Sequence, residues 1–144
     1  MAHPQCTGFS ITEASAVALF AVAAELDCAE DAATFTGALD INRQVWQTLA
    51  RLAEDLDWSF PDRATINRAL RTSGQARMRG NDHLVQALID INRQVSQELA
   101  MGSNLDGLHK QAVSMWQDTG LRLDQWLANE ISRGVRHPPE PRPL

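Results

Sequence analysis

Apolar residues recur along the chain at the three- and four-residue intervals that are typical of amphipathic helices. Ser10 and Glu13 form an S-x-x-E pair, the capping box that begins many helices. The apolar stripe that follows this pair contains Leu19, Val22, Ala23 and Leu26. The pattern therefore predicts a first helix that begins at Ser10 and ends near Cys28.

The second expected helix runs from about Thr34 to Asp57. Residues at heptad spacing indicate that this helix is central and well buried; they are Phe35, Leu39, Asn42, Trp46, Leu49, Ala53 and Leu56. A third helix is expected to have Ser59 as its N-cap and Pro61 in its first turn, and to stop by Gly80.

Heptad spacing returns between residues 81 and 101, which predicts a fourth helix. A long fifth helix is expected over residues 104–133, with Asn104 as its N-cap and bends at Gly107 and Gly120. The tail 134–144 contains four prolines in eleven residues, so we expect it to be extended and mobile.

The expected elements give an all-α fold. The chain contains no tyrosine, lacks alternating β-branched segments and has no proline between Pro61 and Pro138, so nothing in it is typical of a sheet. We expect one compact domain of about five helices over residues 1–133, followed by the flexible tail. The second and fourth helices are expected to form the centre, with the fifth packed across them or reaching to a second molecule.

Composition narrows the class of protein. The 144 residues carry a formal net charge of -5, which argues against a protein built mainly to bind nucleic acid or an anionic membrane. The longest uncharged apolar stretch has eleven residues, whereas a membrane span needs about 20. The first basic residue is Arg43, so a secretory signal is not expected. These features predict a cytoplasmic protein whose cysteines, Cys6 and Cys28, are reduced.

The most specific feature is an internal repeat. The eleven residues Asp40–Ala50 recur as Asp90–Ala100 with nine identities, at a spacing of fifty residues. The simpler interpretation is one type of core helix used twice, with Trp46 in the core. The fuller interpretation is two copies of a helical hairpin, formed by the first and second and by the third and fourth helices and related by a pseudo-twofold axis.

Polar residues within the repeat need partners. Asn42 and Asn92 lie on or beside apolar stripes, where a buried amide must be hydrogen bonded, and we expect them to pair with each other. The repeat also places Asp and Arg three residues apart, a spacing at which exposed ion pairs contribute a few tenths of a kcal/mol. These expected pairs are Asp40 with Arg43 and Asp90 with Arg93.

At these motifs the sequence resembles the flagellar FlaF family. Residues 78–100 resemble its C-terminal signature, an M-R-G turn followed by a helix with L-I-D-I-N-R, and residues 38–46 resemble its earlier A-L-D-x-N-R-x-x-W motif. The resemblance covers about residues 12–101. Between the motifs the family usually has L-P followed by a fairly apolar helix, whereas here Phe60-Pro61 precedes an arginine-rich segment. The fifth helix and the tail are additions.

The resemblance implies a small cytoplasmic factor of flagellum assembly in α-proteobacteria. Such a factor is needed for flagellin production and export, acts as a flagellin secretion chaperone alongside a translational regulator, and is not an enzyme. In physical terms it binds amphipathic helices in a groove. We expect an exposed apolar seam around the fourth and fifth helices to provide the contact surface.

An arginine-rich segment suggests an alternative. Residues 63–79 contain five arginines and no carboxylate. Arg68 and Arg71 lie one turn apart and could contact RNA phosphates or an acidic partner, which makes an RNA-binding regulator of flagellin mRNA the second hypothesis. The simpler interpretation is that these arginines pair with acidic residues of this same protein.

Two tryptophans in the fifth helix, Trp116 and Trp126, are candidate anchors for a partner or for a homodimer without a flagellar role. Ten residues separate them, so on one continuous helix they point about 80° apart, and one is expected to be buried and the other exposed. The sequence contains no catalytic motif and no histidine at metal-ligand spacing, so neither an enzyme nor a metal or other cofactor is expected.

Overall fold

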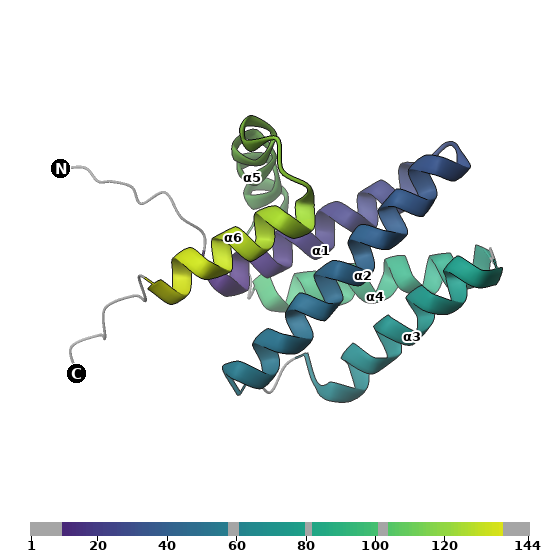
Figure 1. Ribbon diagram of the computed structural model, residues 1–144, viewed down its shortest axis with the longest axis horizontal. Helices are drawn as coiled ribbons and strands as arrows, with labels where there is room; N and C mark the ends of the chain where they lie inside the picture. Colours follow the sequence, from purple (N-terminus) through teal and green to yellow (C-terminus); the bar gives the residue numbers. More distant parts are fainter. Residues whose placement is uncertain (1–9, 58–60, 80–81, 101–103, 137–144) are drawn as a thin grey trace.

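The computed structural model describes residues 10–57, 61–79, 82–100 and 104–136. Within these ranges the chain forms six α-helices and no strand, so the predicted all-α class is confirmed and the predicted number of helices is one too low. The helices are α1 (Ile11–Cys28), α2 (Ala32–Asp55), α3 (Arg63–Arg79), α4 (Asp82–Ala100), α5 (Leu105–Thr119) and α6 (Leu123–Arg136) (Figure 1).

Side-chain caps begin the first two helices. The Ser10 hydroxyl accepts a hydrogen bond from the Glu13 backbone N–H, and the Glu13 carboxylate accepts one from the Ser10 backbone N–H, both at 3.0 Å. The predicted capping box is therefore confirmed. Asp31 caps α2 by accepting from the Thr34 N–H at 2.7 Å, which is why this helix begins two residues before the expected Thr34.

The start of α3 differs from the prediction. Asp62 accepts a hydrogen bond from the Thr65 N–H at 2.8 Å and acts as the cap. Pro61 therefore lies before the helix and not in its first turn. A carboxylate satisfies the free N–H groups at a helix start and interacts favourably with the helix dipole, so Asp62 is the stronger cap. The expected cap Ser59 lies outside the described residues.

The single long helix expected over residues 104–133 is divided in two. Asn104 caps α5 as predicted, but the helix ends at Thr119 and Gly120 follows with φ +71°. Glycine adopts this left-handed conformation without the steric penalty of a Cβ, and it commonly ends a helix. The bend expected at Gly120 is thus a complete break in the helix. Residues 134–136, assigned to the tail, belong to α6, and the rest of the tail lies outside the described residues.

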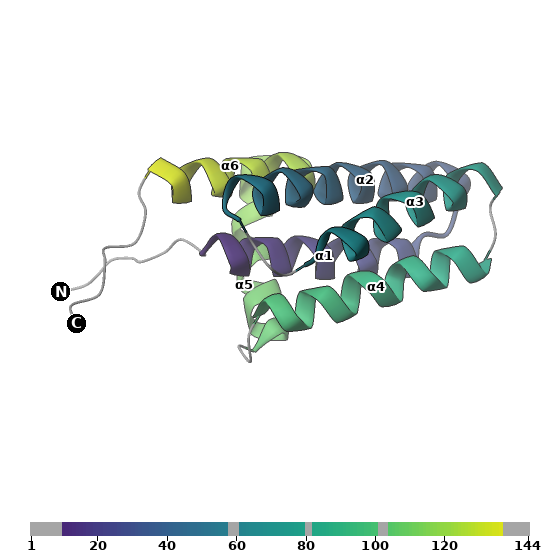
Figure 2. The same ribbon diagram turned by 90° about the horizontal axis from the view of Figure 1, so that it is seen from below.

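The helices form two layers, with α2, α3 and α6 over α1 and α4, while α5 crosses from one layer to the other (Figure 2). The centre is α1 and not the expected pair α2 and α4, because α1 contacts α2, α4, α5 and α6. Every residue from Ala14 to Leu19 is buried. Small side chains on all sides of α1 allow four neighbours to approach it, and a helix that is apolar all round belongs in the interior.

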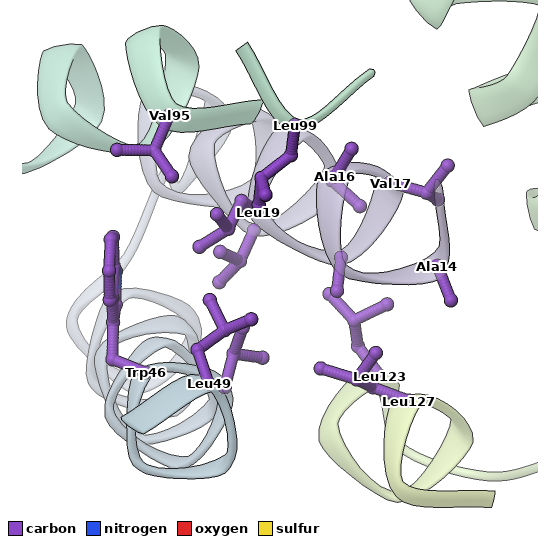
Figure 3. Packing of buried hydrophobic residues seen from close by; sticks show 14 of the residues in the cluster. Ala14, Ala16, Val17, Leu19, Trp46, Leu49, Val95, Leu99, Leu123 and Leu127 are labelled. Atoms are coloured by element: carbon purple, nitrogen blue, oxygen red, sulfur yellow. The ribbon is translucent and has the colours of Figure 1, made fainter. Parts of the chain in front are cut away.

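The main core contains residues of all six helices, and Figure 3 shows Leu19, Trp46, Leu99 and Leu127, which come from α1, α2, α4 and α6. A smaller cluster joins α1, α2, α3 and α4, and it includes Leu26 and Leu88. These contacts bury the apolar face of α4 and leave Leu56 as the one large apolar side chain that is exposed among the described residues. Apolar side chains such as Leu84 on α4 and Leu108 and Met115 on α5 are half-buried, so the seam expected on the fourth and fifth helices is partly covered.

None of the helices in the described ranges is long and apolar enough to span a membrane.

Candidate functional site

A chain of buried hydrogen bonds connects the two copies of the repeat. The side-chain amide of Asn92 donates to the Asn42 carbonyl oxygen at 2.7 Å, so the expected pairing of these residues is present. The Trp46 indole N–H donates to the side-chain carbonyl oxygen of Asn92 at 2.8 Å, and the side-chain amide of Asn42 donates to the Ser73 hydroxyl at 3.2 Å. Asn42, Asn92 and Trp46 are all fully buried. The amide pair therefore links α2 to α4 through the interior.

The network is not symmetric. A shift of fifty residues takes Trp46 to Ser96 and takes Ser73 to Ala23. Ser96 bonds to the Arg93 carbonyl of its own helix, at 2.8 Å, and does not extend the network. Sequence reasoning missed Ser73, although its replacement of an alanine at the matched position was a visible signal.

The ion pairs expected within the repeat are not formed. Asp40 instead accepts from Arg122 at 3.0 Å, and Arg122 also contacts Asp124 at 3.0 Å. Hydrogen bonds with these two carboxylates raise the pKa of Arg122.

The second copy of the repeat also finds partners outside its expected pair. Arg93 contacts Asp27 at 3.4 Å, and Asp90 accepts from the Gln86 amide at 3.0 Å. Contacts with other helices and with an adjacent turn of the same helix thus replace the weak Asp–Arg pairs that were expected at a spacing of three residues.

Three arginines form an exposed basic face on α3, namely Arg63, Arg68 and Arg71. Among the described residues, no carboxylate lies within ion-pair distance of any of them, so the expected pairing with this protein's own acidic residues is not found there. Asp62 has a lowered pKa, caused mainly by the Thr65 hydrogen bonds and to a smaller extent by the charge of Arg68. These three arginines are thus exposed without an ion-pair partner among the described residues.

A groove of about 280 Å³ lies beside the basic face, between α3 and α4. Arg68 and Thr72 line it from α3, and Ala87, Asp90, Ile91 and Gln94 line it from α4. Ile91 and Thr72 are buried, whereas Arg68, Asp90 and Gln94 are exposed. The α3–α4 groove, defined by these six residues, therefore has a partly apolar floor and charged rims of both signs.

The two candidate tryptophan anchors have different environments. Trp126 is only 2% exposed and belongs to the main core, so it is the buried member of the expected pair of one buried and one exposed tryptophan. The break at Gly120 resets the helical phase, and α6 turns its apolar face toward α1. Trp116 is half-buried, and its indole N–H donates to the Leu121 carbonyl, which joins α5 to the segment before α6. Its edge remains a candidate contact.

Two half-buried groups have shifted ionisation. Burial raises the pKa of Glu25. Burial also lowers the pKa of His109, with a smaller opposing contribution from Asp106, and the His109 ring lies edge-on to Phe20 with centroids 5.0 Å apart. Neither group lines the α3–α4 groove. The described residues contain no cluster of three or more side chains able to hold a metal ion.

Comparisons of this chain with protein-family models, with curated proteins and with solved structures find no match.

Proposed function

We propose that this chain is a non-enzymatic flagellar assembly factor, similar to FlaF, that binds flagellin or regulates its synthesis and export. The observation that carries the proposal is the hydrogen bond between Asn42 and Asn92. The resemblance rests on two motifs that are fifty residues apart, and each motif contributes one member of this buried pair. One shared core contact gives both motifs the same structural reason to be present.

The expected binding mode is changed by the buried seam. Because the apolar faces of α4 and α6 are already covered, a partner helix has to bind a mixed surface with apolar and charged positions. Such a surface suits a transient complex, since the non-obligate interfaces of proteins are about as polar as the rest of their surface. Release of the cargo during export requires a transient complex of this kind.

The RNA hypothesis is supported by one observation, the exposure of Arg68 and Arg71 without a carboxylate in ion-pair distance among the described residues. Phosphate contacts of this type make binding strongly dependent on salt. The overall charge of -5 opposes RNA binding, and α3 contains no aromatic residue on which a base could stack. Flagellin therefore remains the first partner to test.

Size-exclusion chromatography with light scattering tests the proposal directly. The protein, whose chain mass is 15.9 kDa, is run alone and mixed with monomeric flagellin from the same organism. A complex with the summed mass of both components supports the proposal. Two unshifted peaks at concentrations well above a Kd of about 1 μM contradict it, because binding of the strength expected for a chaperone gives a complex under those conditions.

A gel-shift assay with the leader of the flagellin transcript separates the RNA hypothesis from the proposal. RNA binding that falls steeply between 50 and 200 mM salt, in a protein that does not bind flagellin, establishes the alternative. A mass of twice 15.9 kDa for the protein alone, lost on Trp116→Ala, supports the homodimer instead.

A further inference from the structure

Positions fifty residues apart have matching environments on the inner side of the two helical hairpins. In α1 and α3, the matched pairs Leu19 and Ala69, Val22 and Thr72, and Leu26 and Ala76 are all buried. The helices α2 and α4 begin at Ala32 and Asp82, again fifty residues apart. The same shift relates Asn42 to Asn92. The contacts made by the first hairpin can therefore indicate what binds at the matching position of the second.

The outer sides of the hairpins differ. Val17, Ala18 and Ala21 on α1 are buried, whereas their counterparts Asn67, Arg68 and Arg71 on α3 are exposed. The outer side of α1 is covered by α5 and α6, and α6 also contacts α2. Figure 3 shows Leu123 and Leu127 of α6 facing the part of α1 that carries Ala14 and Val17.

An exposed charge pair connects the start of α6 to the first hairpin. Arg122, which directly precedes α6, reaches Asp40 on α2 at 3.0 Å. The counterpart of Asp40 in the second hairpin is Asp90, which lines the α3–α4 groove. The counterparts of the other lining residues are Ala18, Val22, Gly37, Ile41 and Gln44. The groove therefore occupies, on the second hairpin, the place where α6 crosses from α1 to α2 on the first.

We propose that the α3–α4 groove is a docking site for an amphipathic helix of a partner protein. The helix carries acidic residues on the edge that faces Arg68 and Arg71, a narrow apolar stripe over Ile91 and Thr72, and a basic residue just before its first turn that reaches Asp90. This inference rests on the proposed function for the identity of the partner, a flagellar subunit, and on the matched hairpins for the site.

The charges on the second hairpin favour an acidic helix as the occupant of the groove over an apolar helix like α6. An apolar helix fits the first hairpin, where the outer positions are Val17, Ala18 and Ala21, but on the second hairpin it would bury two guanidinium groups without a counter-charge. Glutamate or aspartate at those positions supplies the counter-charge. The carboxylate of Asp90 on the rim and the lack of an aromatic lining residue disfavour RNA in the same groove.

Two sets of variants test the site with flagellin as the probe. Arg68→Glu with Arg71→Glu is compared with Arg43→Glu and Arg51→Glu, which change the net charge equally at exposed positions of α2. At about 0.1 M salt we expect the α3 variant to bind flagellin about tenfold more weakly or worse, since attraction at the rim becomes repulsion. The α2 variant should bind within about twofold of the natural protein. Circular dichroism checks that both fold.

A photo-crosslinking residue in place of Gln94, in the groove, gives an independent readout. Lys110, an exposed residue on α5, is the control position. We expect crosslinks from position 94 to a flagellin helix whose sequence is acidic along one edge, and none from position 110.

The other outcomes of these experiments distinguish failure of the groove proposal from failure of the proposed function. Flagellin binding that the α3 variant does not weaken, with no crosslink from position 94, overturns the groove and leaves the proposed function intact. An absence of flagellin binding by the natural protein overturns the flagellin-binding form of the proposed function and, with it, the groove as a flagellin site. If charge reversal on α3 abolishes RNA binding only, or dissolves a dimer of this chain, the occupant of the groove is not an acidic partner helix and the inference is wrong.

Discussion

Removal of the Asn92 side chain tests the buried amide network most directly. In Asn92→Ala, the Trp46 indole N–H loses its acceptor and the Asn42 carbonyl oxygen loses its donor. Both groups remain in a part of the core where Asn42 and Trp46 are fully buried. The substitution therefore removes one residue but leaves two polar groups without partners.

The expected loss follows from the number of groups left unsatisfied. Each buried polar group without a partner destabilises a protein by about 1–3 kcal/mol, so two of them reduce the free energy of unfolding by roughly 4 kcal/mol. This is a large fraction of the 5–15 kcal/mol by which domains are typically stable. At about 2–4 °C per kcal/mol, the melting temperature should fall by roughly 10 °C.

Urea unfolding, followed by circular dichroism and tryptophan fluorescence, measures the change. The matched control is Ser96→Ala, which removes a buried polar side chain from the same helix without touching the network, because Ser96 bonds to the Arg93 carbonyl. The control should change the free energy of unfolding by less than about 1 kcal/mol. The double variant Asn42→Ala with Asn92→Ala should lose less than the sum of its single changes, since the two residues share one contact.

The reasoning is refuted if Asn92→Ala and Ser96→Ala destabilise the protein to the same extent within about 0.5 kcal/mol, or if the Asn42 and Asn92 changes are additive. Either result would mean that the amide pair contributes no more than any other buried polar side chain.

Three further predictions concern local features. Gly120→Ala should lower the melting temperature, because φ there is +71° and Ala destabilises that conformation by about 1 kcal/mol. Gly37→Ala, in a helix with open space around its Cα, should raise the melting temperature. A change of the same sign in both variants would contradict the argument. Ser10→Ala should reduce stability by about 1 kcal/mol through loss of the capping box, measured by urea unfolding, whereas an unchanged midpoint would show that α1 does not depend on its cap. Burial raises the pKa of Glu25 in the folded state, so its contribution is most favourable below the unfolded pKa and is lost as pH rises through the folded value. Glu25→Gln should therefore gain stability over the natural protein at pH 7 and lose that advantage near pH 4, and a pH-independent difference would exclude this cause.

Local signals predicted the helices well. The capping box at Ser10, the cap at Asn104 and the pairing of Asn42 with Asn92 all depend on short-range chemistry or on the repeat, and both are visible in the sequence. The tertiary position of α1 was not predictable in this way. Its alanines carry little weight in an apolar pattern, yet they are what allows several helices to surround it.

The candidate site was predicted only in part. Exposure of Arg68 and Arg71 agrees with the arginine-rich pattern, but the groove beside them depends on how α3 and α4 sit against each other. The spacing of Trp116 and Trp126 on a continuous helix did not indicate which of them is buried, and the structure, with a helix break at Gly120, places Trp126 in the core. Neither the spacing of helices nor the φ angle of a single glycine is encoded in apolar periodicity.

The covering of α1 by α6 has a consequence for synthesis on the ribosome. The first helix to emerge is buried over most of its length, and α6, which covers its outer side together with α5, is the last of the described elements to be made. At roughly 5–20 residues per second, the chain from Leu26 to Trp126 takes about 5–20 s to synthesise. During that interval the outer side of α1 lacks the cover that α6 provides, so apolar side chains that are buried in the folded protein stay exposed on the nascent chain.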